Sequence, residues 1–223
     1  MEDTRTGFLE RIGDEARSAL LGAGRRRPMH SGETLFRESD DAYEVLIVLK
    51  GIVKIWIGAP SGRQVILDVL DAGTVLGELS SIDGAPRSAN AGALEKGELL
   101  VVPIERFRSV VEEYPRIGLE LLHLVAERLR VASRRQLEFS ASDSLGRLCR
   151  AIVDFADRYG TSKDGVRQVL VPMGQGDLAS WNGLSREAIV KGLRALRSLG
   201  WVEGDGRRLR LTDEQALRER AQS

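Results

Sequence analysis

One short segment carries the side chains that a buried phosphate would need. It contains Gly77-Glu78-Leu79 and, a few residues later, Arg87-Ser88-Ala89. A phosphate taken out of water requires hydrogen-bond donors, because an uncompensated charge in an apolar interior is costly. Arg87 and Ser88 can donate to it, as can backbone N–H groups of a short helix starting near Glu78. Glu78 is an acceptor suited to a ribose hydroxyl, and Gly77 lets the backbone approach closely. The alternative is that Glu78 and Arg87 merely pair with each other at a loop.

A second candidate site lies near the C-terminus, where the sequence predicts two helices joined by a tight turn. The first covers residues 177–182, Gly183-Leu184 forms the turn, and the second covers residues 185–199. Ser185 is a good N-cap, and Gly200 follows the last turn as a C-cap residue. Such a pair, with a basic outer face on the second helix, is typical of major-groove DNA binding. The second helix should pack inward through Ile189, Leu193 and Leu196 and present outward Glu187, Lys191 and Arg194, with Arg186 at its open first turn.

Positive charge is concentrated in the same region, although the whole chain has a formal net charge of +0. Between residues 186 and 210, seven basic residues outnumber three acidic ones. Residues 201–211 read as two short strands around Gly204-Asp205-Gly206, a wing that could bring Arg207 or Arg208 to a DNA backbone. Trp181, in the first helix of the pair, is bulkier than the aliphatic residue expected there, and we interpret it as core. The predicted DNA-binding residues are Ser185, Arg186, Glu187, Lys191, Arg194 and Arg207.

The sequence gives little support to catalysis or to metal binding. His30 and His123 are its only histidines and lie far apart, so the ligand cluster of a cupin-type barrel enzyme is missing. Cys149 is the only cysteine, which excludes an intrachain disulfide and a multi-cysteine zinc or iron–sulfur site. No signal peptide and no membrane-spanning run is visible. We therefore expect a cytoplasmic protein that is not an enzyme and has no catalytic residues, metal or resident cofactor.

The N-terminal segment precedes the region of the first candidate site. The sequence predicts a helix over residues 6–21, and the basic run Arg25-Arg26-Arg27 is interpreted as a solvated connection.

Short strands must position the first candidate site. Between residues 29 and 104, short runs rich in Val, Ile and Leu alternate with glycine-bearing turns, which is typical of an antiparallel barrel or jelly roll. Alternation over residues 53–57 should place Val53, Ile55 and Ile57 on one face. The predicted strands cover residues 34–36, 45–49, 52–57, 65–70 and 99–102.

From residue 105 the hydrophobic period becomes helical. A short helix stops near Tyr114-Pro115, and a long helix follows over residues 116–142 with two apolar stripes. One stripe would suffice to pack on the barrel, so the second predicts a partner helix and a homodimer. The alternative is a helix buried on two sides within one subunit. The first stripe contains Gly118, Leu122, Val125, Leu129, Ala132, Gln136 and Phe139; the second contains Ile117, Leu121, Leu124 and Val131.

These elements predict an α+β chain in three parts. Residues 1–115 form a jelly-roll barrel with an N-terminal helix, and residues 116–142 form the long dimerisation helix and hinge. Residues 143–223 form a winged helix-turn-helix. Ser142-Asp143-Ser144 can cap the helix over residues 145–159, and residues 167–171 read as a short strand.

Together, the two motifs resemble the family of the cyclic-AMP receptor protein and the fumarate–nitrate regulator, the CRP/FNR family. The resemblance extends from about residue 8 to residue 211. The run Gly77-Glu78-Leu79-Ser80-Ser81-Ile82-Asp83-Gly84-Ala85-Pro86-Arg87-Ser88-Ala89 looks like the phosphate-binding cassette of that family. Gly183-Leu184-Ser185-Arg186-Glu187, followed by Lys191, looks like its recognition helix.

The resemblance implies a transcription regulator under the control of a cyclic nucleotide, cyclic AMP being the first candidate. It implies a homodimer on a palindromic site with half-sites like GTGA, where Arg186 pairs with a guanine edge and Glu187 accepts from a cytosine. RNA polymerase is a further implied partner. The implied nucleotide-binding residues are Gly77, Glu78, Leu79, Arg87, Ser88, Ala89 and Ser133.

One position departs from the family pattern. In the cyclic-AMP receptor protein, adjacent Thr and Ser residues on the long helix contact the adenine base, and this chain has Ala132 and Ser133 there. Ser133 can still donate or accept a hydrogen bond, whereas Ala132 cannot. The choice of nucleotide therefore stays open, and a constitutive regulator or one that senses another effector is the alternative.

Overall fold

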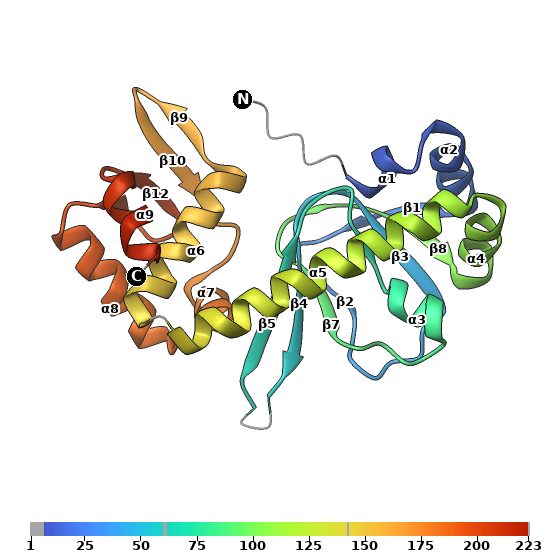
Figure 1. Ribbon diagram of the computed structural model, residues 1–223, viewed down its shortest axis with the longest axis horizontal. Helices are drawn as coiled ribbons and strands as arrows, with labels where there is room; N and C mark the ends of the chain where they lie inside the picture. The colour runs from blue at the N-terminus through green and yellow to red at the C-terminus, as the bar shows by residue number, and fades with distance from the viewer. Residues whose placement is uncertain (1–6, 60–61, 142, 223) are drawn as a thin grey trace. The chain divides into compact units, whose positions relative to one another are not determined.

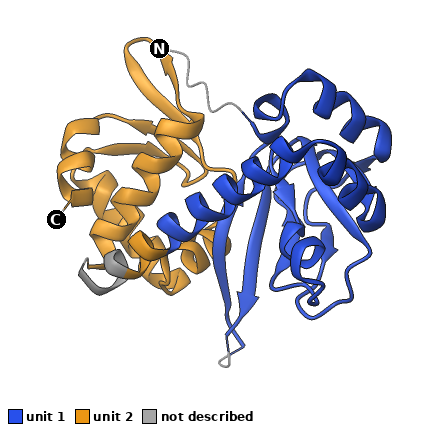
Figure 2. Ribbon diagram, turned by 45° about the vertical axis from the view of Figure 1, so that its right-hand side comes forward, with its two compact units in different colours: residues 1–132 blue, residues 133–223 orange. Residues whose placement is uncertain are grey.

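The computed structural model describes residues 7–59, 62–141 and 143–222 and divides into two compact units (Figures 1 and 2). We call Met1–Ala132 the barrel unit and Ser133–Ser223 the C-terminal unit. The boundary between them falls inside the longest helix, α5 (Pro115–Ala141). Antiparallel strands dominate the first unit and helices the second, which confirms the predicted α+β class.

Two four-stranded antiparallel sheets form the barrel unit, with strand orders β1-β8-β3-β6 and β2-β7-β4-β5. Strands far apart in the sequence are neighbours in both sheets, which is the topology of a jelly roll rather than of simple hairpins. The strands are β1 (Arg25–Met29), β2 (Thr34–Phe36), β3 (Glu44–Lys50), β4 (Val53–Gly58), β5 (Gln64–Leu70), β6 (Val75–Leu76), β7 (Asn90–Ala93) and β8 (Gly97–Pro103).

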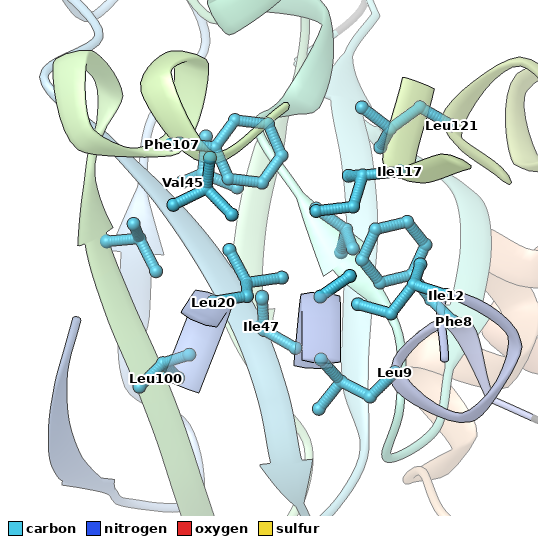
Figure 3. Close-up of a cluster of buried hydrophobic side chains, with 14 of the residues drawn as sticks. Phe8, Leu9, Ile12, Leu20, Val45, Ile47, Leu100, Phe107, Ile117 and Leu121 are labelled. Carbon is cyan, nitrogen blue, oxygen red and sulfur yellow. The ribbon is translucent and has the colours of Figure 1, made fainter. Parts of the chain in front are cut away.

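The core of the barrel unit is built around β3, which is buried on both faces. Leu46 and Val48 belong to a cluster with Met29 and Leu99, formed by residues of both sheets. Val45 and Ile47 belong to a second cluster that also contains residues of α1 (Phe8–Arg11), α2 (Asp14–Ala23), α4 (Ile104–Glu113) and α5 (Figure 3). The predicted helix stripe of Ile117, Leu121 and Leu124 is buried, the first two in this cluster.

Three local expectations for the barrel unit were wrong. The helix expected over residues 6–21 breaks at Gly13, whose φ of 88° is outside the helical range. The basic run at residues 25–27 is not a connection but part of β1, an edge strand paired with β8, where exposed positions tolerate charge. In β4 the buried residues are Val53 and Trp56, because a register shift between Ile55 and Trp56 changes the alternation.

The C-terminal unit joins helices to the four-stranded sheet β11-β12-β10-β9. Asp143 caps α6 by accepting a 2.8 Å hydrogen bond from the Gly146 amide, as predicted, whereas Ser142 lies outside the described residues. The sequence did not lead us to expect β9 or the last helix. The elements are α6 (Ser144–Tyr159), β9 (Thr161–Lys163), β10 (Val166–Leu170), α7 (Gln175–Asn182), α8 (Arg186–Ser198), β11 (Val202–Gly204), β12 (Arg208–Leu211) and α9 (Glu214–Gln222). In the described part of the chain, no helix has the length and apolar character to cross a membrane.

Candidate functional site

The first candidate site is built around the short helix α3 (Glu78–Asp83), which follows β6 in the barrel unit. Gly77 caps α3 in the left-handed conformation, with φ at 76°. A Cβ atom at this position would lie 1.9 Å from Nη1 of Arg87. Gly77 is therefore required twice, by its backbone conformation and by the guanidinium packed against it.

Arg87 is buried beneath this turn, with 4% of its surface exposed. Its Nη1 donates to the Gly77 carbonyl at 3.2 Å, its Nη2 donates to the Glu44 carbonyl, and its guanidinium lies 4.4 Å from the ring centre of Phe36. Burial lowers the pKa of Arg87, and the nearby carboxylates of Glu44, Glu78 and Asp40 oppose that shift. Its buried Nε atom has no hydrogen-bond partner among the described residues. One donor thus remains available to a bound acceptor.

Glu78 is equally buried and is held by an arginine that we had not predicted. Its Oε1 accepts from Nη1 of Arg128 at 2.5 Å, and Nη2 of Arg128 donates to the Val75 carbonyl at 2.8 Å. Glu78 thus forms its ion pair with Arg128 on α5. The alternative prediction, a pair between Glu78 and Arg87, is wrong. Helical spacing could have indicated Arg128, because it continues the buried stripe of Leu121 and Leu124.

The other predicted cassette residues lie along the same segment. Leu79 is 40% exposed, Ser88 is exposed and Ala89 is buried. Ser81 donates to the Glu78 carbonyl at 2.6 Å and accepts at its own carbonyl from Nε of Arg108 at 2.7 Å, which fixes α3 on α4. Ser133 is exposed and belongs to the C-terminal unit, so it is not brought together with the cassette within one unit.

We call the first predicted stripe of α5 the outward stripe, because its two leucines are exposed in the described part of the chain. Leu122 is 66% exposed and Leu129 is 67% exposed, and Leu119 on the same helix is 67% exposed. Val131, the last member of the second predicted stripe, is 39% exposed, unlike Ile117, Leu121 and Leu124. Phe139 lies outside the residues whose side chains are described. Large apolar side chains repeated along one helix at this exposure favour a protein partner.

The second candidate site is the helix pair α7 and α8. Gly183 forms the turn in the left-handed conformation, with φ at 61°, and Ser185 caps α8 by accepting from the Ala188 amide at 3.1 Å. Ile189, Leu193 and Leu196 are buried, as predicted. The residues predicted to contact DNA are all exposed: Ser185, Arg186, Glu187, Lys191, Arg194 and Arg207. Hydrogen bonds from its own amide and from Ser185 lower the pKa of Glu187, so the carboxylate stays charged.

Arg207 lies in the wing between β11 and β12, where Asp205 orders the turn. The Asp205 carboxylate accepts from the amides of Arg207 and Arg208, each at 2.9 Å, and these bonds lower its pKa. Arg210 pairs with Glu203 at 2.8 Å across the same two strands. The backbone at Arg207 and Arg208 is therefore fixed by Asp205, and both side chains are exposed.

Together, the jelly-roll barrel and the winged helix-turn-helix define a DNA-binding transcription regulator, and comparison with known proteins gives its family. The family of cyclic nucleotide-binding domains matches residues 26–114, and the family of Crp-like helix-turn-helix domains matches residues 146–220. The chain belongs to the CRP/FNR family of transcription regulators and is not an enzyme.

Similar proteins cover nearly the whole chain. A CRP-like cAMP-activated global transcriptional regulator of Mycobacterium tuberculosis is 28% identical over 217 residues, 97% of each chain. The transcriptional activator protein FnrA of Stutzerimonas stutzeri is 23% identical, over 86% of this chain and 79% of its own. Among solved structures, a CooA mutant from Carboxydothermus hydrogenoformans has a TM-score of 0.80 at 22% identity, over 98% of this chain and 97% of that one. At 22% identity, the similarity to the CooA structure shows a shared fold only.

Proposed function

We propose that this regulator binds DNA as a homodimer under the control of a cyclic nucleotide, with cyclic AMP as the first candidate. The observation that carries the proposal is the buried Nε of Arg87, a donor without a partner among the described residues in a segment that resembles a phosphate-binding cassette. A buried donor of this kind calls for an acceptor, and a phosphate oxygen provides one with matching charge.

The environment of Glu78 supports the same ligand. Its ion pair with Arg128 orients the buried carboxylate beside Gly77, where it can accept from a ribose hydroxyl. Gly77, Leu79, Ser88 and Ala89 would complete this part of the site, and Ser133 would approach the base. The M. tuberculosis relative is described as cAMP-activated, which is consistent with this choice of nucleotide.

The proposed control is a shift between populations of the dimer. A nucleotide that binds one arrangement more tightly moves the protein toward that arrangement. Two α8 helices would then read half-sites like GTGA in major grooves about 34 Å apart. Arg186 would pair with guanine, Glu187 would accept from cytosine, and Lys191, Arg194 and Arg207 would hold the backbone. Working on DNA, the protein would act in the cytoplasm and communicate with RNA polymerase.

Titration calorimetry tests the nucleotide. We expect cyclic AMP to bind the wild type and Arg106→Ala, a control at an exposed arginine on α4, and not to bind Arg87→Ala. Cyclic GMP titrated in parallel measures the choice of base. If neither cyclic AMP nor cyclic GMP binds the wild type at millimolar concentration, the proposed ligand is wrong.

The outward stripe of α5 provides the test of the dimer. Leu122→Glu combined with Leu129→Glu places charges on this stripe, and we expect sedimentation to change from dimer to monomer. Leu199→Glu, at a 54% exposed leucine of the C-terminal unit, is the control and should remain dimeric. A wild type that sediments as a monomer would contradict the proposal.

One observation favours a second candidate, a family member that is constitutive or senses another effector. Ala132 offers no hydroxyl where the adenine contact is expected, and two of the Arg87 donor atoms already bind protein carbonyls. In that case the protein without nucleotide should bind its DNA site with the same affinity as with nucleotide.

A further inference from the structure

An arginine at the end of α5 stacks on a tryptophan of the DNA-reading helix pair. The guanidinium carbon of Arg135 lies 3.5 Å from the ring centre of Trp181, and both residues belong to the C-terminal unit. Trp181 is only 7% exposed. A planar guanidinium at this distance from an indole face makes a cation–π contact, which is stronger when it is shielded from water.

The contact continues into a row of three aromatic rings within the same unit. Behind Trp181, the ring of Phe155 follows at 5.9 Å, and the ring of Tyr159 lies 6.1 Å from Phe155 in a stacked arrangement. The contact and the row thus join the end of α5 to α7 and α7 to α6. Trp181 and Phe155 are buried and their rings are tilted by 35°, whereas Tyr159 is half-buried. Closely packed rings of this kind resist displacement, because a shift of one ring loses contact with the next.

The surroundings of Trp181 differ from those of an ordinary core residue. Together with Arg135 and Trp181, a small hollow is lined by Arg147, Arg150, Asp154 and Asn182. Three guanidinium groups and a carboxylate therefore line the same hollow as the indole of Trp181. An aliphatic residue at position 181 would fill part of the same space, but it would offer no face for a cation.

We propose that Arg135 is a positioning residue for DNA reading, which fixes α7 to the end of α5 through Trp181. This inference rests on the DNA-reading role proposed for α8. Trp181 is followed directly by Asn182, whose amide donates to the Leu178 carbonyl at 2.8 Å, and by the Gly183 turn that leads into α8. Because these residues are contiguous and ordered, a displacement of α7 must displace the first turn of α8, where Arg186 and Glu187 lie.

The strength of the stack limits the effect that its loss can have. A shielded cation–π contact contributes about 2 kcal/mol, which corresponds to about thirtyfold in an equilibrium constant. We therefore expect Arg135→Gln and Trp181→Leu each to weaken specific DNA binding by about threefold to thirtyfold. Arg135→Lys and Trp181→Phe, which keep a cation and a ring, should restore most of that loss.

The experiment is a double-mutant cycle on the full chain. Binding to a duplex with two GTGA-like half-sites is measured for Arg135→Gln, Trp181→Leu and the double variant, and hydrogen exchange is followed in peptides covering residues 175–183. Arg134→Gln, at an exposed arginine one residue earlier, is the matched control. Unfolding midpoints identify any variant that fails to fold.

The expected result has three parts: faster exchange in α7 for both single variants, wild-type behaviour for Arg134→Gln, and a double variant no weaker on DNA than either single one. Losses that multiply in the double variant, or equal effects at Arg134 and Arg135, would overturn the proposal. If the wild type does not bind the duplex, the proposed half-sites fail, and the exchange measurements alone decide the role of Arg135.

Discussion

The cassette and the recognition helix use the same residue types in opposite environments. In the cassette, Glu78 and Arg87 are 2% and 4% exposed, and each is held by partners from distant parts of the barrel unit. On α8, Arg186 and Glu187 are exposed. The comparison teaches that a site for a small ligand taken out of water must hold its charges with protein partners. A helix that reads a hydrated polyanion can leave them in solvent.

The difference has an energetic consequence. A buried charged side chain satisfies the hydrogen bonds of buried partners, so its removal should lower both the free energy of unfolding and the affinity for the ligand. An exposed charge on a capped helix adds little to the fold, so its removal should affect DNA binding alone.

The largest effect is expected for Arg87→Ala in the absence of any ligand. The substitution leaves the Gly77 and Glu44 carbonyls without their donor and removes the group stacked on Phe36. We expect the free energy of unfolding to fall by about 2–4 kcal/mol, measured by denaturant titration. Unchanged stability would break the comparison, since Arg87 would then behave like a surface residue.

Arg186→Ala should show the opposite pattern. We expect its stability to stay within about 0.5 kcal/mol of the wild type. DNA affinity should fall by about 1–3 kcal/mol, with preference relaxed at one base position. Competition binding on single-base variants of the half-site measures both. An unchanged footprint and unchanged preference would show that α8 does not read DNA in the proposed register.

Gly77→Ala and Gly84→Ala form a matched pair, because the two glycines flank α3 with φ values of 76° and 73°. Each alanine should cost about 1–2 kcal/mol of stability for the left-handed backbone. A Cβ at position 84 meets nothing within 4 Å, whereas one at position 77 collides with Arg87. Only Gly77→Ala should therefore weaken cyclic-nucleotide binding in calorimetry. Equal nucleotide affinity in both variants would separate Arg87 from the ligand.

The smallest effect concerns Asp143, which caps α6 and pairs with Arg220 at 2.5 Å. Asp143→Ala should lower the stability of the C-terminal unit by about 1 kcal/mol. The hydrogen bond from the Gly146 amide and the ion pair with Arg220 hold the pKa of Asp143 below its usual value. The carboxylate therefore stabilises the fold above its unfolded pKa of about 3.9, and this contribution is lost as the pH falls through the folded pKa.

Asp143→Asn provides the control for that pH dependence. Asparagine can still cap the helix but does not titrate. We expect this variant to lose the acid-dependent part of the stability and to keep most of the cap, as measured by thermal unfolding between pH 3 and pH 7. Identical pH profiles for the wild type and Asp143→Asn would assign the acid sensitivity to other groups.

Local signals predicted much of the architecture. The Ser185 cap, the Gly183 turn and the inward face of α8 depend on residues close together in the sequence, and the structure confirms them. The strand positions of β2, β3, β4, β5 and β8 also followed from short apolar runs between turns. Strands β6 and β7 were missed, because β6 has only two residues and β7 is the run Asn90–Ala93, which is poor in large apolar side chains.

The sequence by itself determined the period of each element, its caps and turns, and the chemical types present in the two candidate sites. These properties follow from interactions between near neighbours along the chain. Only the tertiary structure decided which partner each charged side chain has. Glu78 pairs with Arg128, fifty residues away, and Arg135 stacks on the ring of Trp181. It also decided which face of β4 is buried, through a register shift. The physical reason is that packing and desolvation in three dimensions select partners that are distant in sequence. Local hydrophobic periodicity does not predict those partners.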